Sequence, residues 1–181
     1  MHVRQVPDEG PELDARRVFE TLDRFGVEYL VIGGMATRLY GASRLTKDID
    51  VLPSSDGDNL GRLASALLEL GAFLRVGGMS DEEARSLPVV IEAAALRRME
   101  ISTWRTDAGD LDVLHDLRAA DGRRKGFDEL LSSASDATLG TIRVRLASLA
   151  DIVEAKRFAD RDKDRDALPE LERLLRETEN E

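Results

Sequence analysis

The chain of 181 residues has no cysteine, only two histidines and few aromatic residues. The absence of cysteine excludes disulfides, thiolate zinc sites and cysteine nucleophiles, and it is typical of a reducing compartment. The two histidines leave little material for histidine-based catalysis. A domain of this length buries most of its apolar surface on folding, so it needs no covalent crosslinks. We expect one domain, with at most a small appendage.

Long hydrophobic runs are also missing. The longest ones, such as residues 29–32 and 88–91, are far too short to span a bilayer. Residues 1–10 are polar and include Pro7, Asp8 and Glu9, where a secretory signal requires an apolar stretch. We therefore expect a soluble cytoplasmic protein with no membrane partner.

Positive charge is in deficit, because 26 lysines and arginines face 36 acidic residues and the formal net charge is −10. Binding to nucleic acid without sequence preference depends on basic side chains that displace counterions, so this balance argues against a broad surface of that kind. Basic residues do cluster at 97–98, 123–125 and 156–165. Such clusters can line a local groove, although scattered surface charge is their commoner explanation.

Hydrophobic spacing in the first half of the chain alternates between the periods of helices and strands. The pattern predicts helices over residues 11–25, 35–40 and 59–70, and strands over residues 27–32, 47–52 and 73–76. Gly26, Gly41 and Gly71 follow the three predicted helices, where a helix commonly ends. Strands and helices are thus interleaved, which indicates an α/β or α+β fold.

The second half is less regular, and residues 77–98 carry no pattern that can be assigned. Strands are predicted over residues 98–104, 111–115 and 141–146, and a short helix over residues 127–131. Trp104 is expected in the core. Ser148 followed by Asp151 is typical of a helix start, and helical spacing continues to residue 175. We expect a domain of residues 1–147, with residues 1–10 flexible, and a C-terminal helical segment, residues 148–181, packed on it.

Three aspartates stand on predicted strands. Alternation along a strand places Asp48 and Asp50 on one face, where two carboxylates can share hard cations with phosphate oxygens. Asp110 and Asp112 compete for the place of a third carboxylate because they also share a face. Asp112 is favoured, since it alone has apolar neighbours on both sides within the strand.

Gly33 and Gly34 follow the predicted strand 27–32 and precede a helix. Residues without a side chain let backbone N–H groups at a helix start approach phosphate closely. We therefore expect the two glycines to bind the phosphates of a nucleotide.

The order of these features, VIGG at 31–34, DIDV at 48–51 and LDV at 111–113, resembles the nucleotidyltransferase superfamily. The resemblance implies a polymerase-beta-like fold, a mixed sheet flanked by helices with a C-terminal helical segment. It also implies that Asp48, Asp50 and Asp112 hold Mg²⁺, with two ions expected and Mn²⁺ as a substitute. In a two-metal arrangement one ion activates the attacking hydroxyl, and the third carboxylate completes the coordination of that ion.

Within this superfamily the chain is similar to AbiEii-type toxins of bacterial toxin–antitoxin systems and their uncharacterised relatives. The likeness lies in GGMATR at 33–38, RLTKDID at 44–50, LDVL at 111–114, SLADIVEAK at 148–156 and RDKDRD at 161–166. It implies that Lys156 and Asp164 belong to the active site, with Lys156 supplying positive charge to the triphosphate. Arg44 matches a basic position before the paired aspartates. Arg161 or Lys163 could pair with carboxylates or with acceptor phosphate.

The resemblance implies an enzyme that transfers a nucleoside monophosphate from a nucleoside triphosphate to an acceptor hydroxyl. The leading hypothesis is a toxin that acts on the 3′ end of tRNA and is neutralised by a cognate antitoxin. A protein side chain, as in nucleotidylating antitoxins, or a small molecule such as an aminoglycoside is the alternative acceptor. The antitoxin type usually shows Gly-Ser followed by Arg-Gly, which this chain lacks. A binding module without turnover is the non-enzyme alternative, and the three carboxylates count against it.

Overall fold

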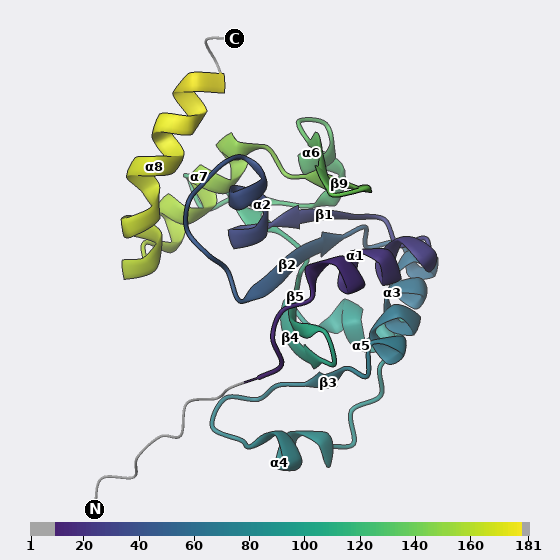
Figure 1. The fold of residues 1–181 in the computed structure, drawn as a ribbon. Coiled ribbons are helices and arrows are strands. Elements are labelled where there is room, and N and C mark those ends of the chain that lie inside the picture. The colour runs from purple at the N-terminus through teal and green to yellow at the C-terminus, as the bar shows by residue number, and fades with distance from the viewer. Residues whose placement is uncertain (1–9, 179–181) are drawn as a thin grey trace, which may run out of the picture.

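A computed structural model describes residues 10–178 of the chain. Flexibility was expected for residues 1–10, and residues 1–9 lie outside the described range. The described chain contains eight helices and nine strands (Figure 1). The helices are α1 Ala15–Arg24, α2 Gly33–Leu39, α3 Gly57–Glu69, α4 Asp81–Arg85, α5 Ala93–Arg98, α6 Phe127–Leu131, α7 Leu149–Ala159 and α8 Asp162–Thr178. The strands are β1 Tyr29–Ile32, β2 Asp48–Pro53, β3 Phe73–Leu74, β4 Ile101–Thr106, β5 Gly109–Leu114, β6 Leu117–Arg118, β7 Arg124–Lys125, β8 Ser135–Leu139 and β9 Ile142–Leu146.

Several helices begin at residues that satisfy the free N–H groups of the first turn. The side chains of Asp14, Asp56 and Ser148 accept hydrogen bonds from backbone N–H groups at the starts of α1, α3 and α7. The predicted helix start at Ser148 is therefore confirmed. The first helix is shorter than predicted, because Asp14 caps it and residues 11–14 precede it in an irregular conformation.

Seven strands form one mixed sheet in the order β3-β4-β5-β2-β1-β9-β8. Strand β2 lies in the middle, antiparallel to β1 and parallel to β5, and β9 is parallel to β1 on the other side. In the view of Figure 1, helices α1, α3 and α5 form one group beside the sheet, and α2, α7 and α8 form another. The mixed sheet flanked by helices that the sequence predicted is confirmed.

Two regions differ from the sequence-based expectation. Residues 77–98 contain the short helices α4 and α5, and residues 117–125 and 135–139 contribute strands that were not predicted. Arg98 is the last residue of α5, so the strand predicted from residue 98 begins only at Ile101. These elements are short, and β8 is an edge strand with little burial on either face. Their side chains therefore show neither the helical nor the strand period of hydrophobicity.

Most buried apolar side chains form one core between the sheet and its helices, and Trp104 is fully buried in it, as expected. A second, smaller cluster packs α8 onto α7 and onto the loop after α2. It is formed by Ala42, Leu149, Val153 and Leu171. The C-terminal helices are thereby fixed beside the end of β1, where the predicted site residues lie. Among residues 10–178, none of the helices combines the length and the apolar character needed to cross a membrane.

Candidate active site

The sheet register brings the three predicted aspartates onto two neighbouring strands. Asp50 of β2 is the direct partner of Asp112 of β5, and Asp48 is the partner of Asp110. Burial alternates along both strands, so Ile49, Val51 and Leu111 are buried while the aspartates share the less buried face. We refer to Asp48, Asp50 and Asp112 as the aspartate cluster.

Asp110 and Asp112 differ sharply in their partners, although they share a face of β5. Asp110 accepts from Arg75 at 2.9 Å and from Arg105 at 3.0 Å, so two guanidinium groups neutralise its charge. Asp112 has no ion pair of this kind, and its Oδ1 atom is buried without a hydrogen-bond partner among the described residues. An unsatisfied buried carboxylate oxygen is costly and indicates a missing ligand. This geometry favours Asp112 as the third carboxylate.

The surroundings of the aspartate cluster disfavour the ionised form of two of its carboxylates. Burial, followed by the charges of Asp48 and Asp112, raises the pKa of Asp50 to about 7, although Lys163 and the Gly34 backbone N–H act in the opposite direction. Burial also raises the pKa of Asp112, more than a hydrogen bond from Thr103 lowers it. Like charges that are brought together in a partly buried place are typical of functional sites rather than of stabilising ion pairs.

The two glycines lie against the aspartate cluster, because Ile32 of β1 is the sheet partner of Asp50. Gly33 has a φ of +62°, and a Cβ atom there would lie 2.1 Å from Asp50 Oδ2. A Cβ atom on Gly34 would lie 2.8 Å from the hydroxyl oxygen of Thr46. Only glycine therefore fits at positions 33 and 34, because the Asp50 carboxylate and the Thr46 hydroxyl occupy the space that a side chain would need. Phosphate binding by Gly33 and Gly34 stays a prediction, and they do stand at the start of α2.

The C-terminal residues implied by the resemblance gather around one buried carboxylate. Asp164 is fully buried and accepts from Lys156 at 3.1 Å and from Arg161 at 2.6 Å. Burial works against ionisation, but these two hydrogen bonds hold the pKa of Asp164 below its ordinary value. Both carboxylate oxygens of Asp164 are thus engaged by neighbouring cations. Its role in nucleotide binding stays a prediction.

The charge of Lys163 acts on Asp50 and Asp112 in this geometry, and the active-site role of Lys156 stays a prediction. The Lys163 charge lowers the pKa of both Asp50 and Asp112, whereas Lys156 is engaged by Asp164. Arg44 donates to the backbone carbonyl of Lys163 at 3.1 Å and so ties the loop before β2 to the start of α8. The RDKDRD motif contains Lys163, but the sequence alone gives no reason to choose it over Lys156 or Arg161 as the cation near the carboxylates. That choice depends on how α8 meets the loop.

The donor set fits a divalent metal. Within residues 10–178, no three Asp, Glu or His side chains converge closely enough to enclose a metal ion by themselves. Mg²⁺ does not require such a cage, because it is usually held by one or two carboxylates together with substrate phosphates and water. The unpartnered Oδ1 of Asp112 and the raised pKa of Asp50 are what a carboxylate site without its cation would show.

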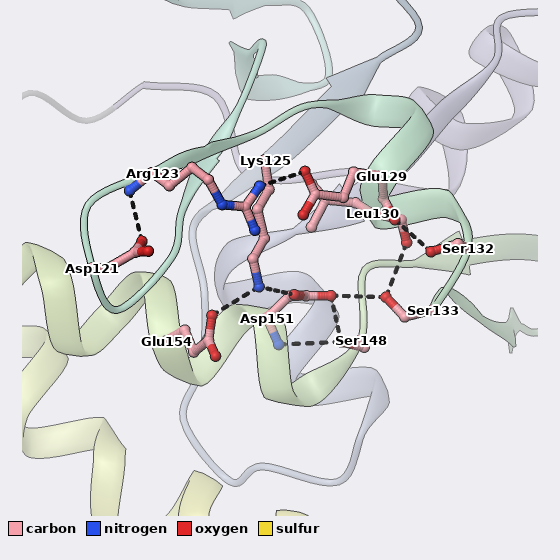
Figure 2. Close-up of polar contacts among 10 residues, drawn as sticks. All are labelled: Asp121, Arg123, Lys125, Glu129, Leu130, Ser132, Ser133, Ser148, Asp151 and Glu154. Carbon is pink, nitrogen blue, oxygen red and sulfur yellow. Dashed lines mark hydrogen bonds and ion pairs between the residues drawn. The ribbon is translucent and has the colours of Figure 1, made fainter.

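A second charged cluster lies apart from the aspartates and is fully paired (Figure 2). Lys125 of β7 reaches toward α7 and donates to Asp151 and Glu154, both at 2.8 Å. Asp151 also accepts from the hydroxyl groups of Ser133 and Ser148. We refer to these five residues as the Lys125 network. It joins the β6–β7 hairpin and the end of α6 to the first turn of α7, and one ammonium group is shared by two carboxylates.

Comparison with known proteins supports the fold at the level of structure. No protein-family model and no curated protein matches the chain. A lincosamide antibiotic adenylyltransferase, LnuA, in its lincomycin-bound structure matches with a TM-score of 0.58 and 17% identity, over 90% of this chain and 99% of that one. The chain has the nucleotidyltransferase fold. ANT(2″)-Ia in complex with adenylyl-2″-tobramycin matches with a TM-score of 0.53 and 16% identity, over 88% of this chain and 91% of the other.

The crystal structure of a putative nucleotidyltransferase (TM1012) from Thermotoga maritima matches with a TM-score of 0.50 and 18% identity, over 90% of this chain and 91% of the other. The nucleotidyltransferase fold predicted from the sequence is therefore confirmed. The likeness to AbiEii-type toxins stays a prediction, since these structures are not of that type.

Proposed function

We propose that this protein is a metal-dependent nucleotidyltransferase, which transfers a nucleoside monophosphate from a nucleoside triphosphate to an acceptor hydroxyl. The observation that carries the proposal is the aspartate cluster. Three carboxylates lie on adjacent strands and form no ion pair among residues 10–178, and one oxygen of Asp112 is buried without a hydrogen-bond partner in that range. The nucleotidyltransferase fold supports the same reaction class. A reducing compartment rich in nucleoside triphosphates, the cytoplasm, suits this chemistry.

In this proposal the aspartates bind the metal and Lys163 provides positive charge. Asp48, Asp50 and Asp112 would hold Mg²⁺, which when bound offsets the negative charge of the triphosphate and of the transferred group. The acceptor oxygen attacks the α-phosphorus and loses its proton, and the bond to the leaving pyrophosphate breaks. Lys163, held by Arg44 at its backbone, provides positive charge near the phosphates. Stabilisation of charge at fixed positions is the main contribution of a protein to such reactions.

Two acceptor classes have specific support. The AbiEii likeness implies the 3′ end of tRNA and a toxin with a cognate antitoxin, and the basic groups of Arg44, Arg161 and Lys163 at the start of α8 are suited to a phosphate backbone. The structural neighbours that act on lincomycin and tobramycin, small hydroxyl-bearing antibiotics, have nearly the same length as this chain. The net charge of −10 favours the small molecule over the nucleic acid.

One experiment tests both the reaction and the acceptor. The purified protein is incubated with Mg²⁺ and each of the four labelled nucleoside triphosphates, and with total tRNA, a protein lysate, an aminoglycoside or a lincosamide in separate reactions. We expect label on one acceptor class, with loss of transfer in Asp48→Asn. Asp136→Asn is a matched control, because Asp136 lies on β8 and pairs with the exposed Arg145. Tight nucleotide binding with no transfer to any acceptor would show a binding module instead.

A further inference from the structure

Thr46 lies two residues before the first aspartate of the cluster and touches it directly. Its Oγ1 atom lies 2.8 Å from Asp48 Oδ1 and 3.0 Å from the Asp48 backbone carbonyl oxygen. The side chain is half-buried, and Gly34 lies behind it so closely that a Cβ on that glycine would lie 2.8 Å from Oγ1 and 3.0 Å from the Thr46 Cβ. The hydroxyl therefore has a fixed place between α2 and β2.

The hydrogen-bond donor to Asp48 is the neutral hydroxyl of Thr46, and this distinguishes Asp48 from Asp110, its neighbour in the sheet. Asp110, the register partner of Asp48, is neutralised by Arg75 and Arg105. The hydrogen bond from Thr46 orients one carboxylate oxygen of Asp48 and leaves the negative charge in place. A cation in the place of Thr46 would also orient the carboxylate, but it would cancel the charge that a metal requires.

We propose that Thr46 is a positioning residue for metal binding, which holds the Asp48 carboxylate in the orientation that directs its second oxygen toward the cluster. This inference rests on the proposed function for the identity of the ligand as a divalent cation. A hydroxyl that donates to a metal-ligating carboxylate fixes the orientation of that carboxylate before the metal arrives. Thr46 acts through Asp48 and does not itself touch the metal or the substrate.

The test compares Thr46→Val, which keeps the shape but removes the hydroxyl, with Thr46→Ser, which keeps the hydroxyl. Mn²⁺ affinity is measured by calorimetric titration of the purified protein without nucleotide. Thr46→Val should bind Mn²⁺ ~10–100-fold more weakly than the wild type, the range typical of lost partners of metal ligands. Thr46→Ser should stay within ~3-fold of the wild type by the same reasoning.

A matched control removes a threonine hydroxyl elsewhere. Thr21 donates to the Arg17 carbonyl within α1 and is part of the core rather than of the site. Thr21→Val should leave Mn²⁺ affinity unchanged, which separates a local effect from a general loss of stability. In turnover, Thr46→Val should raise the Mg²⁺ concentration that gives half the maximal rate, and saturating Mg²⁺ should recover most of kcat.

The outcomes separate the two proposals. Wild-type Mn²⁺ affinity in Thr46→Val, or an equal loss in Thr46→Ser, would overturn the role of Thr46 while the transferase function stands. Mn²⁺ binding that depends on Thr46 and Asp48, with no transfer to any acceptor, would support the positioning role and overturn the proposed function. A wild-type protein that binds no Mn²⁺ without nucleotide would overturn the positioning role of Thr46, and the transfer assay alone would then decide the proposed function.

Discussion

The aspartate cluster and the Lys125 network are both rich in charge and partly buried, yet they are built in opposite ways. In the Lys125 network each acid meets a cation or a hydroxyl, and every bond closes within the protein (Figure 2). In the aspartate cluster like charges meet, and one oxygen of Asp112 has no partner among the described residues. A network in which every polar group has a hydrogen-bond partner stabilises the packing of its elements, whereas buried polar groups without partners are typical of a ligand-binding site.

The two pKa patterns show the same contrast. In the cluster, burial and neighbouring carboxylates raise the pKa of Asp50 and Asp112. In the network, burial of Asp151 is outweighed by hydrogen bonds from Lys125, Ser148 and Ser133, which hold its pKa below the ordinary value. Folding therefore favours ionisation of Asp151 and disfavours ionisation of Asp50 and Asp112. Substitutions in the two regions should consequently separate activity from stability.

The largest effect is expected for Asp50→Asn. It should lower the rate of nucleotidyl transfer by ~10³-fold or more, because the loss of a metal ligand removes several kcal/mol of charge stabilisation. The melting temperature of the metal-free protein should not fall, since a repelled carboxylate has been replaced by a neutral amide. Transfer assays and thermal unfolding check the two parts. A clearly less stable variant would mean that the cluster also holds the fold together.

The second prediction concerns Lys125→Met, which leaves Asp151 and Glu154 without their shared cation. The free energy of unfolding should fall by ~2–4 kcal/mol, because removal of one partner leaves a poorly compensated charge in a half-buried place. Urea unfolding measures this change. Arg145→Met is the control, since its exposed pair with Asp136 should contribute less than ~1 kcal/mol. Transfer activity per folded molecule should be unaffected, and a loss of activity without loss of stability would contradict the comparison.

The third prediction distinguishes two lysines that are close in sequence. Lys163→Met should reduce kcat/KM for the nucleoside triphosphate by ~10-fold or more, the effect of losing one charge-assisted contact of ~1.5–3 kcal/mol. Lys156→Met should mainly lower stability, because it removes one of the two cations that Asp164 requires in its buried position. Steady-state kinetics and urea unfolding of both variants test this division. The reverse result would restore Lys156 as the cation of the active site.

The smallest effect is expected from acid titration of Asp151. Its pKa is depressed in the folded protein, so its contribution is complete above the unfolded value of about 3.9 and is lost as the pH falls through the folded value. Asp151→Asn should thus cost ~1–2 kcal/mol at pH 7, and the difference from wild type should shrink below about pH 4. Urea unfolding at several pH values measures this, with Asp136→Asn as an exposed control. A constant difference at all pH values would contradict the ionic origin.

Local patterns of the sequence were sufficient for the central elements and for the shared face of Asp48 and Asp50. Side chains two residues apart on a strand lie on one side whatever surrounds the strand. The same reasoning predicted β1, β2, α3 and the start of α7 close to their observed bounds. It failed for β8 and for residues 77–98, where short or exposed elements bury too little surface to leave a periodic pattern.

The tertiary structure decided which charged side chains remain available for a ligand. Alternation could not separate Asp110 from Asp112 by contact. Arg75 and Arg105, distant from each other in sequence, pair with Asp110 and not with Asp112. Likewise, the RDKDRD stretch does not indicate that Asp164 engages Lys156 or that the charge of Lys163 acts on Asp50 and Asp112. The sequence determined the carboxylate pair and the strand that holds it, because those depend on neighbours along the chain. The partners of Asp110 and Lys156 depend on contacts between distant parts of the chain, and only the packed structure specifies them.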